Sequence, residues 1–525
     1  AEPPAAAPIA QMPAPVRAVT PVAGVTPVTP VTPVTPVTGV DEAIALVLEV
    51  LETCRDPFAV ERAIDGIARF GAEARSAQAT LSPVAKRARQ LLERPPAARL
   101  RIALAATAAG WATGQRVDAV LARHFPPQAS PHRPDIGFNG VFAARNDDVL
   151  AVVRAGRAAP MLSLPSDARG TVQPSDLVER LQACGAEGLA PGPNDLALAL
   201  MRLGAEGRAD ARARLRPGSE AERAVAYALG APLRPETTAG PWVAAWAARA
   251  PHEPDEDIVR LAGRPLAGAG TPARLSLVVG RESSGPYAWC VPKTEVTPAP
   301  HAENALFPSS AFHLPRAHGF HSVNACGETA EDIGWGSLVW PAHMEPFFAN
   351  AIAAMDTDQK LSDHPCLAFL EPLFRPGTSC GPMAQSMLGY YLASSDRSVT
   401  AMAVEAVAAL AADGRLAADA LAERTWPFLE TGTLPLSRWV RAFREIAAVS
   451  PDHAAFVRRV MAGLLRFAPD AMPRDLGAML ELLFELQSAG GTGIRDSGAR
   501  TCLGQVRGSG KAATHARKLL ALDAR

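Results

Sequence analysis

Short amphipathic segments bounded by helix start signals recur along most of this chain. Asp56-Pro57 precedes one apolar helical face, and Ser450-Pro451 precedes another. A Ser or Asp acceptor followed by proline is typical of a helix N-terminus, because proline lacks an N–H that would have no partner there. With 48 Pro and 41 Gly in 525 residues, the pattern predicts many short helices instead of a few long elements.

Apolar residues recur with a helical period in many segments, and this pattern predicts a series of helices along the chain. In the last third, helix starts recur about every 20 residues, so a helix pair takes about 40, the length of a HEAT- or armadillo-type unit. One such pair cannot bury both of its faces, and stacking on its neighbours supplies the missing apolar cover. No unit repeats another in sequence, so the expected fold is mainly α, an irregular α-solenoid of HEAT/armadillo-like pairs. The predicted helices begin at Asp41, Asp56-Pro57, Ser82-Pro83 and Leu100, and others cover 174–184, 194–203, 398–412, 436–446, 451–464 and 476–486.

Changes in composition predict the domain organisation. The triplet Val-Thr-Pro recurs between Val25 and Thr38, and proline at every third position blocks both helix and central strand. Leu275–Val279 and Tyr287–Val291 are typical of strands, so a small β-containing insert is expected around 271–350. We therefore predict a disordered Pro/Val/Thr-rich linker at 1–39, N-terminal helical repeats at 40–160, an irregular helical segment at 161–270, the β-containing insert at 271–355 and C-terminal helical repeats at 356–525.

Charge and cysteine usage argue against several classes of protein. Lys and Arg number 52 against 53 Asp and Glu, giving a net charge of −1, whereas a protein that holds DNA by its phosphates usually shows a basic excess. The seven cysteines are widely spaced and contain no C-x-x-C pair, which favours free thiols in a reducing cytosol over a disulfide framework. No apolar run is long enough for a membrane span. The chain begins at Ala1, and we expect a piece of a longer cytoplasmic polypeptide.

Several stretches, taken in order, resemble a family of large bacterial proteins known only as domains of unknown function. Proteins of that family are typically encoded beside MoxR-type AAA ATPases, von Willebrand A-domain proteins and SWIM zinc-finger proteins. The resemblance implies a helical, HEAT-like protein with no assigned reaction, and it supplies no catalytic residues. The matching stretches are 60–66, 162–166, 177–181, 195–203, Trp340-Pro341, 345–348, 413–416 and 510–513.

Cys380 lies in a segment that suggests peptidase chemistry. Ser379-Cys380-Gly381-Pro382 looks like the helix start of bacteriocin-processing-type cysteine peptidases, in which the helix dipole favours a thiolate. Catalysis also needs a histidine base, but the later histidines His453 and His515 lie on predicted helices. A helix start followed by a packed apolar face is the favoured interpretation, and a cysteine-dependent hydrolase is the alternative.

A histidine cluster between 301 and 343 raises the second alternative, a zinc-binding protein. Imidazole and thiolate are the ligands that tetrahedral Zn²⁺ prefers, yet the spacings match no familiar zinc finger, and we expect no metal. A zinc site would use His313, His318, His321 and Cys326, and the wider cluster adds Cys290, His301 and His343.

Two glycine-rich stretches are not the motifs they resemble. Gly508-Ser509-Gly510-Lys511 lacks the first glycine and the final Ser/Thr of a phosphate-binding loop, since Gln505 and Ala512 occupy those positions. Gly280 to Gly285 lacks the spacing of a nucleophile elbow. Loose acidic residues around the insert, from Glu328 to Asp363, are interpreted as solvated loop charge.

These patterns predict a non-enzymatic protein-interaction scaffold with no catalytic, cofactor or metal site, because stacked helical pairs create an extended surface for a partner. A MoxR-type ATPase or an A-domain protein is the expected partner by analogy with gene neighbours, which is association and not physics. Neither nucleic acid nor a membrane is expected to bind. Trp335, Trp340, Phe347 and Phe348 are candidates for a contact surface, with a core role as the alternative.

Overall fold

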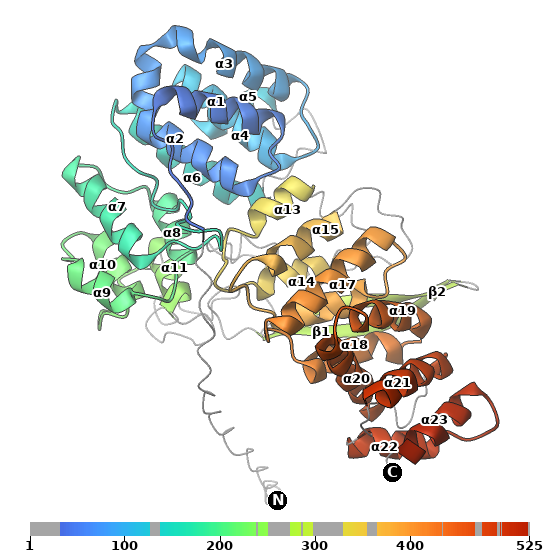
Figure 1. Ribbon diagram of the computed structural model, residues 1–525. Coiled ribbons are helices and arrows are strands. Elements are labelled where there is room, and N and C mark those ends of the chain that lie inside the picture. The colour runs from blue at the N-terminus through green and yellow to red at the C-terminus, as the bar shows by residue number, and fades with distance from the viewer. Residues whose placement is uncertain are drawn as a thin grey trace, which may run out of the picture.

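A computed structural model shows a chain that is mainly helical (Figure 1). Two helical regions lie side by side, the first from α1 to α11 and the second from α13 to α23, and a two-stranded hairpin lies between them in sequence. The structure describes residues 32–125, 137–237, 240–249, 274–284, 287–297, 329–353, 365–432, 434–467, 475–490, 494 and 496–522.

The first region begins with a bundle around α4 (Arg99–Thr113). This helix is buried on nearly every side, from Leu100 to Trp111, as expected of a helix that is apolar all round. It packs against α3 and α6, while α2 packs against α1 and α6. The other helices of the bundle are α1 (Val40–Glu52), α2 (Pro57–Ser76), α3 (Gln78–Glu93), α5 (Val117–His124) and α6 (Gly137–Arg154).

A set of shorter helices completes the first region. Their central element is α8 (Pro193–Met201), which packs against both α6 and α11 and is buried from Asp195 to Met201. The connection from Met161 to Leu164 is buried as well. The remaining members are α7 (Pro174–Ala186), α9 (Arg208–Arg214), α10 (Glu220–Ala228) and α11 (Gly240–Arg249).

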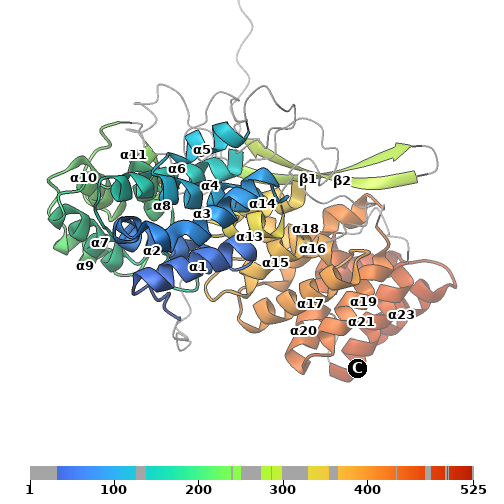
Figure 2. The same ribbon diagram turned by 90° about the horizontal axis from the view of Figure 1, so that it is seen from above.

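The second region is a two-layer row of helices. One layer places α13, α15, α17, α19, α21 and α23 in succession, and the other places α14, α16, α18, α20 and α22 in succession. The row runs away from the first region (Figures 1 and 2), an arrangement consistent with an α-solenoid. The helices are α13 (Ala330–Gly336), α14 (Glu345–Ala353), α15 (Pro365–Leu370), α16 (Pro382–Tyr391), α17 (Arg397–Ala412), α18 (Ala418–Glu430), α19 (Leu436–Ala447), α20 (Pro451–Arg466), α21 (Leu476–Gly490), α22 (Ser497–Gln505) and α23 (Lys511–Leu522), with the 3-10 helix η2 (Glu371–Phe374) after α15.

The expected β-containing insert over 271–350 is not seen as a separate unit. Within the described part of that range, pairing is confined to β1 (Arg274–Ser284) and β2 (Tyr287–Thr297), which form one antiparallel hairpin beside α14, α16 and α18 (Figure 2). Residues 330–353 instead form α13 and α14 and belong to the helical row. The two predicted strands are therefore confirmed, whereas the aromatic residues that suggested a larger insert serve helix packing.

The helix starts agree with the sequence where a side chain caps the backbone. Asp56 accepts a hydrogen bond from the Phe58 N–H, and Ser450 accepts one from the His453 N–H. Asp41 does not cap α1, because the N-cap is Gly39, and Pro83 lies inside α3 instead of at its start. Proline tolerated in the first turns of a helix gives the same local signal as proline at its first position.

The end of the predicted linker is bound to the first region. Residues 32–38 run in an extended path beside 166–168, where the Val34 N–H donates to the Ser166 carbonyl and the Ala168 N–H donates to that of Thr32, both at 3.0 Å. Val37 is only 3% exposed and is part of the core. The prediction of a disordered linker is therefore wrong for residues 32–38. The valines of the Val-Thr-Pro triplets, Val34 and Val37, give this segment apolar side chains that pack against the core. Residues 1–31 lie outside the described part.

Among the described helices, none combines the length and the apolar character that crossing a membrane requires.

Candidate functional site

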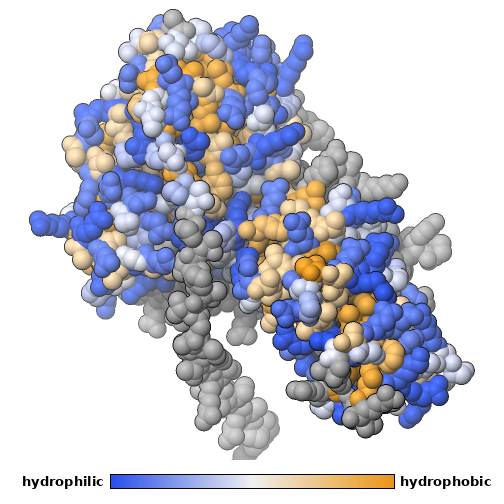
Figure 3. Space-filling view, in the orientation of Figure 1, coloured by the Kyte–Doolittle hydropathy of each residue, from blue (hydrophilic) through white to orange (hydrophobic). Residues whose placement is uncertain are grey.

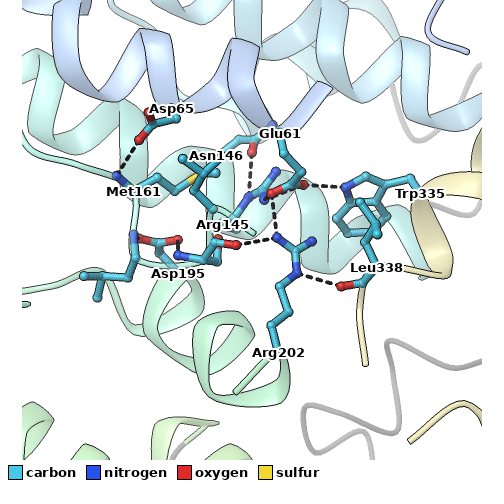
Figure 4. Close-up of polar contacts among 12 residues, drawn as sticks. Glu61, Asp65, Arg145, Asn146, Met161, Asp195, Arg202, Trp335 and Leu338 are labelled. Atoms are coloured by element: carbon cyan, nitrogen blue, oxygen red, sulfur yellow. Dashed lines mark hydrogen bonds and ion pairs between the residues drawn. The ribbon is translucent and has the colours of Figure 1, made fainter. Parts of the chain in front are cut away.

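The most distinctive polar feature of the molecule is a buried ion cluster around Glu61 (Figure 4). Glu61 on α2, Arg145 on α6 and Arg202 after α8 are each 0% exposed. The Arg145 Nη1 lies 2.8 Å and 2.7 Å from the two Glu61 carboxylate oxygens, and the Arg202 Nη1 lies 2.6 Å from Oε2. One carboxylate therefore holds two guanidinium groups from different helices.

The second region completes this cluster. The Trp335 Nε1–H on α13 donates to Glu61 Oε1 at 2.7 Å, and the Arg202 Nε–H donates to the Leu338 carbonyl at 2.6 Å. The Trp335 ring also lies edge-on to Phe142, with ring centroids 4.9 Å apart. The cluster thus joins four segments that are far apart in the sequence.

Asp332 makes a second polar link from α13 to the first region. Its carboxylate accepts hydrogen bonds from the Leu100 N–H at 2.7 Å and the Arg99 N–H at 3.2 Å. These are the first residues of α4, whose own N-cap residue, Ala98, offers no side-chain acceptor. The second region therefore supplies the N-terminal cap of the central helix of the first region, where a negative charge is favoured.

The electrostatics of the cluster favour a charged carboxylate. Burial acts to raise the pKa of Glu61, but the charges and hydrogen bonds of Arg145 and Arg202 outweigh burial and lower that pKa to about 2. Burial also lowers the pKa of Arg202, and the Glu61 charge opposes this effect. We take the cluster as ionised at neutral pH, since a guanidinium does not deprotonate in proteins.

Three further carboxylates, two of them buried, hold backbone in the first region. Asp65 accepts from the Met161 N–H, and Asp195 accepts from the N–H groups of Leu162 and Ser163. Asp148 accepts from the N–H groups of residues 194 and 195 at the start of α8. Burial raises the pKa of all three carboxyl groups. Asp65 and Asp195 are buried and position the chain away from solvent, and Asp65 also pairs with Arg69 at 2.7 Å. Asp148 is half-buried and lines a surface cavity beside α6.

Cys380 is not placed as a nucleophile. Its side chain is buried, and burial together with the nearby Glu345 carboxylate raises the pKa of its thiol to about 12. The thiolate that a cysteine peptidase needs is therefore disfavoured. His453 contacts the Ser450 hydroxyl and the Ala408 carbonyl, and the His515 ring lies against Phe484. These contacts give neither histidine the role of a base toward Cys380.

The four proposed zinc ligands all lie outside the described residues, namely His313, His318, His321 and Cys326. His301 of the wider cluster lies outside them as well. His343 is described, and its ring packs against Trp340 with centroids 4.5 Å apart. Cys290 lies within β2. Across the residues that the structure does describe, no group of three or more His, Cys, Asp or Glu is arranged to hold a metal ion.

The aromatic residues suggested as a contact surface are core residues. Trp335, Trp340, Phe347 and Phe348 are at most 4% exposed. Phe347 packs against Phe348 and Phe369, with centroids 5.3 Å and 5.1 Å apart. The core alternative is therefore the correct one.

Two surface cavities are the remaining candidates for a binding site. One of about 420 Å³ is lined by charged residues of α5 and α6, among them Arg116, Asp118 and Asp147, and these side chains pair with one another. The other, of about 860 Å³, lies at the far end of the second region and is lined by Arg507 and Lys511 together with the first residues of α19 and α21.

The buried cluster was not identified from the sequence, although a signal existed. Glu61 follows Val60 and precedes Ala63 and Ile64 on an apolar helical face, and Arg202 stands between Met201 and Leu203. A charge inside such a run is rarely buried unless it is paired. Sequence reasoning could have singled out these charges, but not the partners that meet them across the fold.

Comparison with known proteins divides the chain near the boundary between the two regions. Residues 29–264 match the model of one domain of unknown function (DUF7824), and residues 278–503 match that of another (DUF7825). A search of curated proteins and a search of solved structures each found no match. The chain thus carries two adjacent domains of unknown function, and α13 of the second match inserts Asp332 and Trp335 into the first.

Trp335→Phe removes the indole N–H and leaves a smaller aromatic ring at the same position. In Trp335→Phe, Glu61 loses one donor, and we expect the free energy of unfolding to fall by about 1.5–3 kcal/mol, the range for hydrogen bonds to charged groups. Urea unfolding of the full chain measures it. Trp426→Phe, at a half-buried ring of α18, is the matched control and should change stability less. Equal losses in the two variants would contradict the role given to the N–H.

The environment of Cys380 predicts slow reaction with thiol reagents. In the native protein, Cys380→Ala should leave the number of thiols that react at neutral pH unchanged, whereas in urea it should lower that number by one. Ellman-type titration of both proteins in both states provides the measurement. Rapid native labelling that disappears in Cys380→Ala would show an accessible, ionised thiol and would restore the hydrolase interpretation.

Proposed function

We propose that this chain is a non-enzymatic scaffold that binds a protein partner along its second region. The supporting observation is the two-layer row from α13 to α23, in which each helix packs against its neighbours in the row. Such a row leaves long surfaces on both layers instead of one closed pocket, and these surfaces suit extended contact with another protein.

The helix pairs of the row support a HEAT/armadillo-like interpretation. From α17 to α20, successive helices of 16, 13, 12 and 16 residues follow one another with short connections. The α19 helix buries Trp439, Phe443 and Ile446 and exposes Arg441 and Arg444 on its other side. This division into a buried and a polar face is what a stacked repeat requires.

The chemistry of the buried polar groups also favours a scaffold over an enzyme. Glu61, Asp65 and Asp195 bind side chains or backbone within the core, and Cys380 is held as a neutral thiol. A general acid, base or nucleophile must instead reach a substrate. These four buried groups therefore serve the fold.

Surface composition indicates the kind of contact that a partner would make. Among the described residues, Val449, at 57%, is the one exposed large apolar side chain. On the face shown in Figure 3, hydrophilic residues dominate, and apolar ones gather in groups over the first region and along the second. Because large apolar side chains are so rarely exposed among the described residues, recognition would depend on charge and hydrogen bonding.

The family resemblance suggests which partners to test first. Proteins of the resembled family are encoded beside MoxR-type AAA ATPases and von Willebrand A-domain proteins, so one of these is the expected partner. This expectation is an association between genes and has no support from geometry.

The proposal is tested by binding between purified proteins. The full chain is immobilised, and the ATPase and the A-domain protein encoded nearest to its gene are passed over it by surface plasmon resonance. We expect saturable binding of at least one, mapped by cross-linking to α13–α23. Absence of binding by both would overturn the scaffold proposal, and turnover of a peptide substrate that is lost in Cys380→Ala would favour the hydrolase alternative.

A further inference from the structure

The last two described helices lie in a stretch that carries cations and no acidic residue. Between Ser497 and Leu522 the sequence contains no Asp or Glu, whereas the whole chain has a net charge of only −1. Such a run of one sign at the end of a helical stack creates a local positive potential, even though the chain as a whole is nearly neutral. The cations of this basic end are Arg500, Arg507, Lys511, Arg517 and Lys518.

The fold places all five cations at the surface. Each is exposed, while the opposite sides of α22 and α23 bury Cys502, Leu503, Ala516 and Leu519. Both helices lie at the far end of the described row (Figures 1 and 2). An exposed face of a repeat stack needs polar residues for solubility, but solubility alone does not require that every charge be positive.

A cavity gives this charge a defined location. The cavity of about 860 Å³ is lined by Arg507 and Lys511 together with Ser437 of α19 and the start of α21. Lys511 forms an ion pair with Glu481 at 2.7 Å, which orients its ammonium group, and Lys518 lies over the Phe484 ring at 5.4 Å. Asp475 is the one acidic residue in the lining. The cavity is therefore open and of mixed polarity, with Arg507 and Lys511 as its cations.

We propose that the basic end binds an acidic segment of a protein partner, with carboxylates seated between Arg507 and Lys511. This inference rests on the proposed scaffold function and names the surface and the chemistry of its partner. Arg and Lys suit this role because Arg can grip a carboxylate with two parallel N–H donors and Lys acts as a point charge.

The observations favour an acidic peptide over a nucleic acid. A nucleic-acid site needs a basic stripe that follows the phosphate backbone, usually with aromatic residues for bases to stack on. Here the positive charge ends within one helix pair, since α21 contributes Glu481 and Glu485 beside it. Carboxylates on a short segment fit a patch of this extent.

The test uses the full chain and a fluorescein-labelled oligo-glutamate peptide. Fluorescence anisotropy should show saturable binding that weakens as salt is added. In Arg507→Glu/Lys511→Glu, affinity should fall by at least about tenfold, the change that 1.4 kcal/mol of lost attraction produces. The control, Lys86→Glu/Arg89→Glu, reverses two exposed cations of α3 and should leave the affinity unchanged.

Further measurements test whether each variant is folded and whether the site prefers a peptide to a nucleic acid. Circular dichroism must show native helix content in every variant. The double variant Arg507→Gln/Lys511→Gln removes the two cations without placing new negative charges beside Glu481. Oligodeoxythymidine of equal charge should bind more weakly than the peptide. Tighter binding of the oligonucleotide, absence of peptide binding, or an equal loss in the α3 control would each overturn the proposal.

The two proposals can fail separately. If a purified partner binds the wild type and Arg507→Glu/Lys511→Glu equally well, the acidic-segment proposal fails while the scaffold stands. If neither candidate partner binds the wild type, the scaffold proposal fails even where the oligo-glutamate peptide is held.

Discussion

Glu61 carries a negative charge in a place that water does not reach, and much of the architecture follows from that constraint. A buried carboxylate is costly unless charged and hydrogen-bonding partners replace the lost hydration. Here the partners come from three other segments, namely Arg145 on α6, Arg202 after α8 and Trp335 on α13. The charge is therefore compensated only when all four segments have come together, and the α13 contact ties one matched domain to the other.

Buried ion clusters of this kind are poor sources of net stability, since apolar residues of equal volume often serve as well. Their effect lies in specificity, because a mispaired arrangement leaves a charge without compensation. The same logic applies to Asp332 at the start of α4 and to Asp195 beneath Leu162 and Ser163. Each carboxylate accepts from backbone N–H groups far away in sequence, so it fixes the position of a segment that helix propensity alone would leave free.

The sequence predicted the positions of the helices better than the contacts between them. Apolar faces such as Trp439, Phe443 and Ile446 on α19 follow directly from a period of 3.6 residues. The beginning of α3 was misplaced, because Pro83 lies inside the helix and not at its first position, and the local sequence does not distinguish the two. The burial of Glu61 and the binding of residues 32–38 depend on distant segments, and no local pattern reports such contacts. Trp340 and the aromatic residues near it suggested a separate insert, but they are buried between helices. Composition alone does not show which surface an aromatic side chain covers.

The claim that Glu61 couples the two regions is tested most directly by hydrogen exchange in Glu61→Gln. If Glu61 couples the two regions, amide exchange in the variant should be faster in both matched domains, at Leu162 and Ser163 and also across α13. The free energy of unfolding should fall by about 3–5 kcal/mol, as when a buried ion pair loses one partner. Faster exchange confined to α2, with α13 as protected as in the wild type, would contradict it.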